Sequence, residues 1–314
     1  MGTGIPVVVI RGILEGGKTY FINDSIKNGD FGDIGRTLIL VQEEGIEEYD
    51  EALLKKFDSV AVSVEKDEWT DSHIYELVRK YKPQFVFIEK NEMWDTAEEK
   101  TFIPDYFDVQ QVIGIADGQT FSAYLNNMRQ KLVDVIKECD LFIVNRCEAT
   151  QETSQMKNNV KLINPSVTVI ALDEDGRELR LVSDLPYDVS SPVISLKLSD
   201  FGAFYVDTFD NKDRYDGKIV ETVCQAAISR GFPANTFVAG RQAMTCCAAD
   251  IQFIGHLCAY DNRFKVKNKS WIYLTARIHY IEVPGIPEEQ IVLEAMDIQQ
   301  VAPPSEEEQV INLT

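Results

Sequence analysis

Glycine, lysine and threonine residues near the N-terminus stand at the spacing G-x-x-x-x-G-K-T, which is the pattern of a phosphate-binding loop. Glycines at these positions let the backbone approach a phosphate closely, so that loop N–H groups point at the anion. Lys18 would contact the β- and γ-phosphates of a nucleotide, and the Thr19 hydroxyl would hold a Mg²⁺ ion. The predicted nucleotide-binding residues of this loop are Gly12, Gly16, Gly17, Lys18, Thr19 and Tyr20.

The segments on either side of the loop decide whether this pattern is meaningful. Residues 6–10 are a continuous apolar, β-branched run, typical of a buried parallel strand. Beyond Thr19, the apolar residues Phe21, Ile22 and Ile26 form one face of a predicted helix. A glycine turn that matches by chance is the alternative. The order strand, loop, helix favours a nucleotide-binding P-loop.

Two carboxylates follow predicted strands further along the chain. Glu43 comes after a strand at residues 36–41, and Glu89 ends an apolar strand at residues 85–88. Ligands of an open α/β sheet bind at the carboxyl ends of its strands, and P-loop enzymes place a Mg²⁺-organising acid there. We therefore predict Thr19 and Glu89 as Mg²⁺ ligands, and Lys18, Glu43 and Glu89 as catalytic residues. On composition alone, the acidic segment around Glu43 also fits a solvated loop.

A further predicted strand, residues 141–144, leads into Asn145, Arg146, Cys147 and Glu148. A strand that ends in Asn-x-x-acid is typical of GTPases, in which the asparagine packs against guanine and the acid accepts hydrogen bonds from its nitrogens. Here the acid is a glutamate, which is one methylene longer than the usual aspartate. The spacing alone is a weak signal, and its place in a series of strands and helices strengthens it. Asn145, Arg146 and Glu148 are the predicted base-binding residues.

Strands and helices alternate up to about residue 170, including a long predicted helix at residues 120–138. This alternation predicts an α/β fold, with a mostly parallel sheet and helices on both faces, for a P-loop domain at residues 1–184. Residues 185–194 read as a linker. Residues 305–314 read as a loose acidic tail.

Between linker and tail, the sequence changes to short strands separated by turns. The predicted strands lie at residues 193–198, 218–228, 236–244, 270–282 and 291–301, with one predicted helix at residues 248–260. This pattern predicts a smaller, mainly β, OB-like domain at residues 195–304.

The overall charge limits the classes of partner. The 314-residue chain has a formal net charge of −20, which argues against a nucleic-acid partner and against attachment to an anionic membrane surface. No apolar run approaches the ~20 residues of a membrane-spanning helix. The first strand begins too early to leave room for a signal peptide, so we expect a cytoplasmic protein whose six cysteines are reduced.

Two adjacent cysteines, Cys246 and Cys247, are a candidate site for a soft metal such as Zn²⁺, with Asp250, His256 and Cys258 nearby. Adjacent cysteines at the end of a strand point to opposite faces, which makes joint ligation awkward. Buried structural cysteines are therefore the favoured alternative.

Taken in order, these motifs resemble those of the CobW-type GTPases, which include metallochaperones and metallocentre-assembly proteins. Besides the P-loop, the matching segments are Gln42–Gly45, Ile115–Phe121 and Ile163–Pro165. The resemblance implies GTP and Mg²⁺ as ligands. Besides the glutamate at position 148 in place of aspartate, this chain departs from the family in two further places. It has no cysteine at residues 60–64, where the family has a C-x-C-C metal motif, and it has Glu92 where the family has a glycine that senses the γ-phosphate.

The C-terminal part is similar to the C-terminal domain of the YcgQ-type proteins, which are associated with a membrane permease. The segments Asp200–Gly202, Tyr215–Lys218 and Met244–Asp250 carry this resemblance. Two hypotheses follow. The first is a Mg²⁺-dependent GTPase in metal handling, with a metalloprotein or permease partner. The second is a nucleotide-binding regulator of a permease that hydrolyses slowly or not at all.

Overall fold

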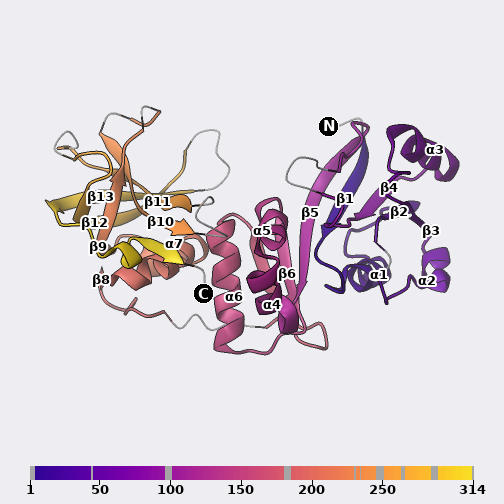
Figure 1. Ribbon diagram of the computed structural model, residues 1–314, viewed down its shortest axis with the longest axis horizontal. Helices are drawn as coiled ribbons and strands as arrows, with labels where there is room; N and C mark the ends of the chain where they lie inside the picture. Colours follow the sequence, from indigo (N-terminus) through magenta and orange to yellow (C-terminus); the bar gives the residue numbers. More distant parts are fainter. Residues whose placement is uncertain are drawn as a thin grey trace. The chain divides into compact units, whose positions relative to one another are not determined.

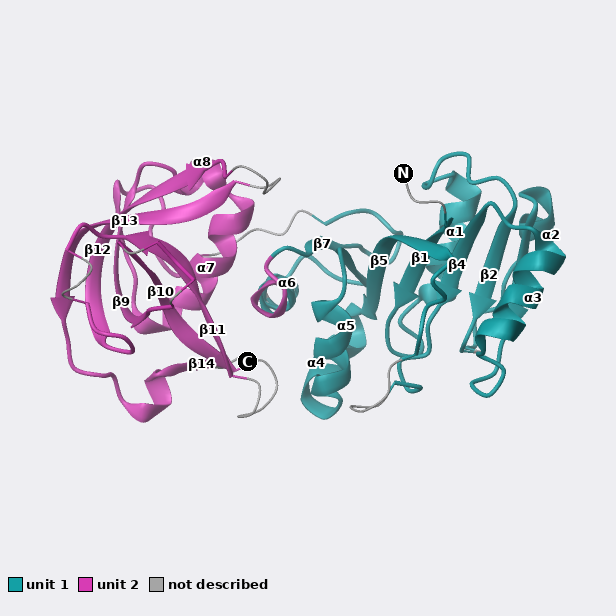
Figure 2. Ribbon diagram, turned by 90° about the horizontal axis from the view of Figure 1, so that it is seen from above, with its two compact units in different colours: residues 1–160, 166–181 teal, residues 161–165, 182–314 magenta. Residues whose placement is uncertain are grey.

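The computed structural model describes residues 4–43, 45–95, 101–179, 185–229, 231–233, 235–244, 251–262, 266–283 and 289–312 (Figure 1). The chain divides into two compact units, which Figure 2 draws in different colours. Unit 1 comprises residues 1–160 and 166–181, and unit 2 comprises residues 161–165 and 182–314.

Unit 1 is built on a seven-stranded sheet with the strand order β3-β2-β4-β1-β5-β6-β7. All of the strand pairs in this sheet are parallel. The strands are β1 (Ile5–Arg11), β2 (Thr37–Val41), β3 (Ser59–Ser63), β4 (Phe85–Glu89), β5 (Phe107–Asp117), β6 (Leu141–Asn145) and β7 (Thr168–Ala171). The predicted parallel α/β fold is confirmed.

Helices cover both faces of this sheet because its strands are apolar on both faces. One face packs against α1 through Ile22 and Ile26 and against α2 through Leu54. The other face packs against α3 through Ile74 and Leu77. The helices of unit 1 are α1 (Lys18–Asn28), α2 (Glu51–Lys56), α3 (Asp71–Tyr81), α4 (Gly118–Asn127), α5 (Arg129–Lys137) and α6 (Gln151–Ile163).

The strand order decides which loops meet. Strand β1 lies between β4 and β5, so the P-loop that follows β1 emerges between the ends of these two strands. The parallel register aligns Ile10 with Glu89 and Arg11 with Gly114. The sheet therefore brings the P-loop, Glu89 and the ends of β5 and β6 to one edge.

Unit 2 is a small five-stranded barrel with additions. Strands β10, β11, β13, β12 and β9 pair in that order, and the pairing of β9 with β10 closes the ring. The elements are β8 (Val193–Ser195), α7 (Phe201–Asp210), α8 (Lys212–Tyr215), β9 (Ile219–Ala227), β10 (Thr236–Met244), β11 (Ile251–Ala259), β12 (Trp271–Ile281), β13 (Gln290–Gln300) and β14 (Val310–Asn312), with short 3₁₀ turns at Leu198–Asp200 and Glu306–Glu308. The predicted small β-barrel is confirmed.

The helix predicted at residues 248–260 is wrong, because residues 251–259 form strand β11. Its buried positions alternate, at Ile254, His256 and Cys258, and the polar His256 among them hides the strand pattern in the sequence. β11 pairs closely with β10 where Gly240 faces Gly255. A Cβ at Gly240 would lie 2.1 Å from the Ile254 carbonyl oxygen, so a side chain has no room there.

Three smaller predictions also need correction. The helix expected at residues 120–138 is divided into α4 and α5 at Met128. The strand expected at residues 193–198 ends at Ser195. Residues 310–312 are not a loose tail, since β14 pairs with β10 in parallel.

Among the described residues, no helix is both long and apolar enough to cross a membrane.

Candidate nucleotide-binding site

The P-loop joins β1 to α1 in a backbone conformation that only glycine adopts readily. Gly12 and Gly17 have φ angles of 151° and 99°. A Cβ at Gly12 would lie 2.3 Å from the Ile115 carbonyl oxygen, and a Cβ at Gly17 would lie 2.5 Å from Asn145 Nδ2. The loop is thus a close-fitting cradle that a side chain at either position would disrupt.

Lys18 begins α1 and is buried. Its ammonium group donates hydrogen bonds to the carbonyl oxygens of Gly12, at 2.8 Å, and Ile13, at 3.4 Å. It also pairs with the carboxylate of Glu43. The structure therefore brings together two of the predicted catalytic residues, and the lysine charge lies inside the loop where phosphates would bind.

The Thr19 hydroxyl donates a hydrogen bond of 2.8 Å to one oxygen of Glu89, and Tyr49 donates its hydroxyl to the other oxygen. Burial raises the pKa of Glu89, although both hydrogen bonds and nearby Lys18 favour the charged form. A hydroxyl and a carboxylate at the carboxyl edge of the sheet are hard oxygen donors, the kind that Mg²⁺ prefers. The residues present therefore fit a Mg²⁺ ion.

Asn145 ends β6 and contacts the P-loop directly. Its Nδ2 donates a hydrogen bond of 2.8 Å to the Gly16 carbonyl oxygen. Asn145 Oδ1 is buried and has no hydrogen-bond partner among the residues that the structure describes. The absence of a Cβ at Gly17 is what allows this approach.

Arg146 follows with a left-handed φ of 53°. Its guanidinium lies 2.6 Å from Asp117 at the end of β5 and donates a hydrogen bond of 2.9 Å to the Glu15 carbonyl oxygen. Asp117 also caps α4 by accepting a hydrogen bond of 2.7 Å from the Gln119 N–H. Arg146 therefore ties the ends of two strands to the P-loop.

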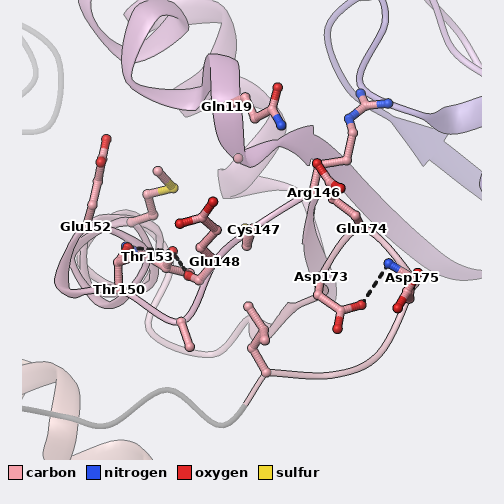
Figure 3. A pocket seen from close by; sticks show the side chains of 14 residues that line it. Gln119, Arg146, Cys147, Glu148, Thr150, Glu152, Thr153, Asp173, Glu174 and Asp175 are labelled. Atoms are coloured by element: carbon pink, nitrogen blue, oxygen red, sulfur yellow. Dashed lines mark hydrogen bonds between the residues drawn. The ribbon is translucent and has the colours of Figure 1, made fainter.

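A cavity of about 600 Å³ lies beside Arg146, within the usual size range of a ligand pocket. Glu148 lines it together with Gln119, Cys147 and Met156, and Asp173 is on the segment after β7 (Figure 3). Burial raises the pKa of the Cys147 thiol to about 11, so this thiol is neutral. The cavity presents carboxylates, which accept the N–H groups of a base.

Glu92, which stands at the glycine position of the resembling family, is buried against Arg11. Arg11 Nε and Nη2 donate hydrogen bonds of 2.8 and 2.6 Å to the two oxygens of Glu92. The Arg11 guanidinium also pairs with Glu138. Lys131 donates a hydrogen bond of 2.8 Å to the Glu92 carbonyl oxygen. The segment after β4 is therefore held by a bidentate ion pair.

The remaining predicted residues divide into two groups. Tyr20 is on the first turn of α1 with its side chain 58% exposed, and it lines the cavity of the P-loop. Cys246 and Cys247 lie outside the described residues. Within the described part of the chain, no three His, Cys, Asp or Glu side chains are grouped to hold a metal ion.

His256 and Cys258, which were considered with those cysteines, are both buried in the barrel. His256 Nε2 lies 3.0 Å from Thr208 Oγ1, and burial lowers the histidine pKa to about 3. Cys258 is a buried thiol whose pKa is raised well above its ordinary value by burial. Both are accounted for as core residues.

Three residues of the site were missed in the sequence. Tyr49 has no motif around it, and its contact with Glu89 depends on where the loop after β2 folds. Glu15 stands inside the P-loop, yet its contact with Ile46 N–H is a tertiary one. Asp117 was detectable, because it is an acidic residue that ends a strand, the feature that singled out Glu89.

Comparisons with known proteins match both parts of the chain. Residues 176–308 match the model of the DUF1980 C-terminal domain. A search of curated proteins gives no significant match. Among solved structures, the hydrogenase maturation factor HypB from Archaeoglobus fulgidus is similar at 18% identity and a TM-score of 0.40, covering 56% of this chain and 85% of that one. The Zn(II)-bound YjiA GTPase from E. coli is similar at 14% identity and a TM-score of 0.41, covering 72% of this chain and 74% of that one.

The match to a nucleotide-binding family covers more than half of the chain. The model of the CobW/HypB/UreG nucleotide-binding domain matches residues 6–171, which include the P-loop, Glu89 and the Asn145 loop. The chain belongs to the CobW/HypB/UreG family of nucleotide-binding proteins.

Proposed function

We propose that the chain is a GTP-binding protein that hydrolyses GTP with Mg²⁺, and that it works in metal handling or in the assembly of a metal centre. The observation that carries this proposal is the meeting of Lys18, Thr19 and Glu89 at one edge of the sheet. Thr19 and Glu89, 2.8 Å apart, supply oxygen ligands beside the lysine that neutralises phosphate charge.

Each residue has a definite task in this proposal. Lys18 exchanges its contact with Glu43 for the β- and γ-phosphates, and the loop N–H groups hold the same phosphates. Thr19 and Glu89 would hold Mg²⁺, and Tyr49 fixes the Glu89 carboxylate through its hydroxyl. Glu43, freed from Lys18, orients the attacking water. Bound Mg²⁺ would neutralise charge that develops on the phosphates.

The positions of Asn145 and Glu148 support guanine as the base of the bound nucleotide. Asn145 Nδ2 uses one hydrogen on the Gly16 carbonyl oxygen and keeps a second for a ring nitrogen of the base. Glu148 lines the adjacent cavity, where its carboxylate accepts hydrogen bonds from the N–H groups that distinguish guanine from adenine.

A second function is favoured by Glu92. A buried, bidentate glutamate at the γ-phosphate-sensing position supports slow hydrolysis, and with it the role of a nucleotide-binding regulator of a permease. Zn²⁺ binding by Cys246 and Cys247 stays a prediction, tested by the metal content of the protein beside a Cys246→Ser/Cys247→Ser variant.

Phosphate release from GTP by the purified protein separates the two functions. Sustained, Mg²⁺-dependent release that is lost in Lys18→Ala supports the GTPase. Tight binding of GTP without release supports the regulator. Tight nucleotide binding by Lys18→Ala would overturn both, and a preference for ATP would overturn the assignment of Asn145 and Glu148.

A further inference from the structure

The phosphate site of the P-loop is closed by a carboxylate of the chain itself. Glu43 follows β2, and its side chain, only 9% exposed, pairs with Lys18 inside the loop. A carboxylate is an oxyanion, so it makes with the ammonium group the same charge-assisted hydrogen bond that a phosphate oxygen would make. Glu43 and a nucleotide phosphate therefore compete for one cation.

A second contact holds the same segment from the P-loop side. Glu15 adopts a left-handed φ of 62° within the loop. Its Oε1 accepts a hydrogen bond of 3.2 Å from the Ile46 N–H. Gly45 lies beside this carboxylate, and a Cβ there would be 3.4 Å from Glu15 Oε1, an ordinary van der Waals contact. Glu43 and Ile46 are thus each attached to the P-loop, Glu43 by its own carboxylate and Ile46 by that of Glu15.

The cavity under this segment is small and negatively charged. Its volume is about 110 Å³, well below the ~300–1,000 Å³ of ordinary ligand pockets. The charged side chains that line it are the carboxylates of Glu15, Glu43, Glu47 and Glu89 and the cations of Lys18 and Arg146. A nucleotide's phosphates enter this site only if the carboxylates move away from Lys18.

We propose that Glu43 and residues 45–47 form an autoinhibitory clasp: Glu43 and Glu15 hold the phosphate site shut, and a Mg²⁺-bound nucleotide opens it by displacing Glu43 from Lys18. This inference rests on the proposed nucleotide binding. It adds that competition between Glu43 and a phosphate for Lys18 sets the affinity for the nucleotide. Ile46, whose side chain is 86% exposed, moves with the clasp when Glu15 releases its N–H.

The test compares nucleotide affinities of three single variants of the full-length protein, with Mg²⁺-GDP as the probe so that hydrolysis does not intervene. Glu43→Gln keeps the side-chain shape and removes the competing charge, and we expect it to bind about tenfold more tightly than the parent. Glu15→Ala removes the acceptor of the Ile46 N–H, and we expect a smaller gain in the same direction.

Glu47→Gln is the matched control, because Glu47 lines the same cavity. If the effect of Glu43 were only its negative charge near the phosphates, Glu47→Gln would bind as tightly as Glu43→Gln, and the clasp would be overturned. A gain confined to Glu43→Gln and Glu15→Ala supports it. If the parent and Glu43→Gln both fail to bind nucleotide, the proposed function fails as well. Binding by Glu43→Gln alone supports the clasp.

Amide hydrogen exchange gives a second, independent measurement. With the clasp closed, the Ile46 N–H is bonded to Glu15, and displacement by Mg²⁺-GDP exposes it. We expect faster exchange in the peptide covering residues 45–48 when Mg²⁺-GDP is added, and no such change in Glu15→Ala, where the peptide already exchanges fast. Unchanged or slower exchange in the parent overturns the clasp.

Discussion

The buried pair of Arg11 and Glu92 gives a prediction whose magnitude follows from the structure. Both side chains are nearly inaccessible, at 2% and 4% exposure, and two hydrogen bonds join them. Removing one partner of such a pair leaves a buried charge, which costs about 3–5 kcal/mol of the free energy of unfolding. Because Glu138 still faces Arg11 from the other side, we expect the lower end, about 3 kcal/mol, for Glu92→Gln.

Glu138 offers a matched control on the same guanidinium. Its side chain is 48% exposed, so its ion pair with Arg11 is screened by water, and Glu138→Gln should cost less than about 1 kcal/mol. The double variant Arg11→Met/Glu92→Leu removes both buried charges and should recover most of the loss seen in Glu92→Gln.

Urea unfolding in a Trp271→Phe background measures these effects, since the remaining tryptophans, Trp69 and Trp94, both lie in unit 1. A loss of about 3 kcal/mol lowers the urea midpoint by roughly 1–3 M at ordinary slopes. Equal losses in Glu92→Gln and Glu138→Gln would refute the reasoning, as would a double variant less stable than Glu92→Gln.

Three further predictions concern the loop, the metal position and the barrel. Gly17→Ala places a methyl group 2.5 Å from Asn145 Nδ2, at a backbone φ of 99° that favours glycine. Guanine nucleotides should therefore bind at least tenfold more weakly in a titration. Unchanged affinity would contradict the role of this loop in nucleotide binding. Tyr49→Phe removes a hydrogen bond that favours the charged Glu89 carboxylate, so the pKa of Glu89 should rise further. The pH above which Mg²⁺ strengthens nucleotide binding should then be higher than in the parent. An unshifted pH profile would contradict this. Burial lowers the pKa of His256 to about 3, so between pH ~6.5 and 3 only the unfolded state takes up a proton on this residue. The free energy of unfolding should therefore decrease as the pH decreases, by up to about 1.4 kcal/mol per pH unit. His256→Gln should reduce that slope, measured by urea unfolding at several pH values.

The P-loop and the parallel sheet were predictable because their signals are local. Lys18 and Thr19 are fixed by a spacing within eight residues, and the strand before them is a continuous apolar run. Glu89 was singled out by an equally local signal, since it is an acidic residue at the end of an apolar strand downstream of the P-loop. The strand order was not predicted, because β1 pairs with β4 and β5, neither of which follows it directly in the sequence.

The second unit shows where local signals fail. Helix α7 is buried over most of its surface, at Phe201, Phe204, Tyr205 and Val206 among others, so no polar face marks its period in the sequence. Strand β11 has the opposite problem, because His256 faces the interior and Thr208 satisfies its polarity from α7. A buried polar residue whose partner is 48 positions away cannot be assigned from its own neighbours.

Two ion pairs near the P-loop predict where movement occurs. The Arg11–Glu92 pair is shielded from solvent and does not line the cavity of the P-loop, so a nucleotide has no direct means of breaking it. The Lys18–Glu43 pair lies in that cavity, where a phosphate competes for the lysine. A conformational change follows a ligand only through contacts that the ligand favours in one state over the other. Nucleotide-dependent movement should therefore be confined to Glu43 and residues 45–47 after β2, while the segment after β4 stays fixed by Arg11.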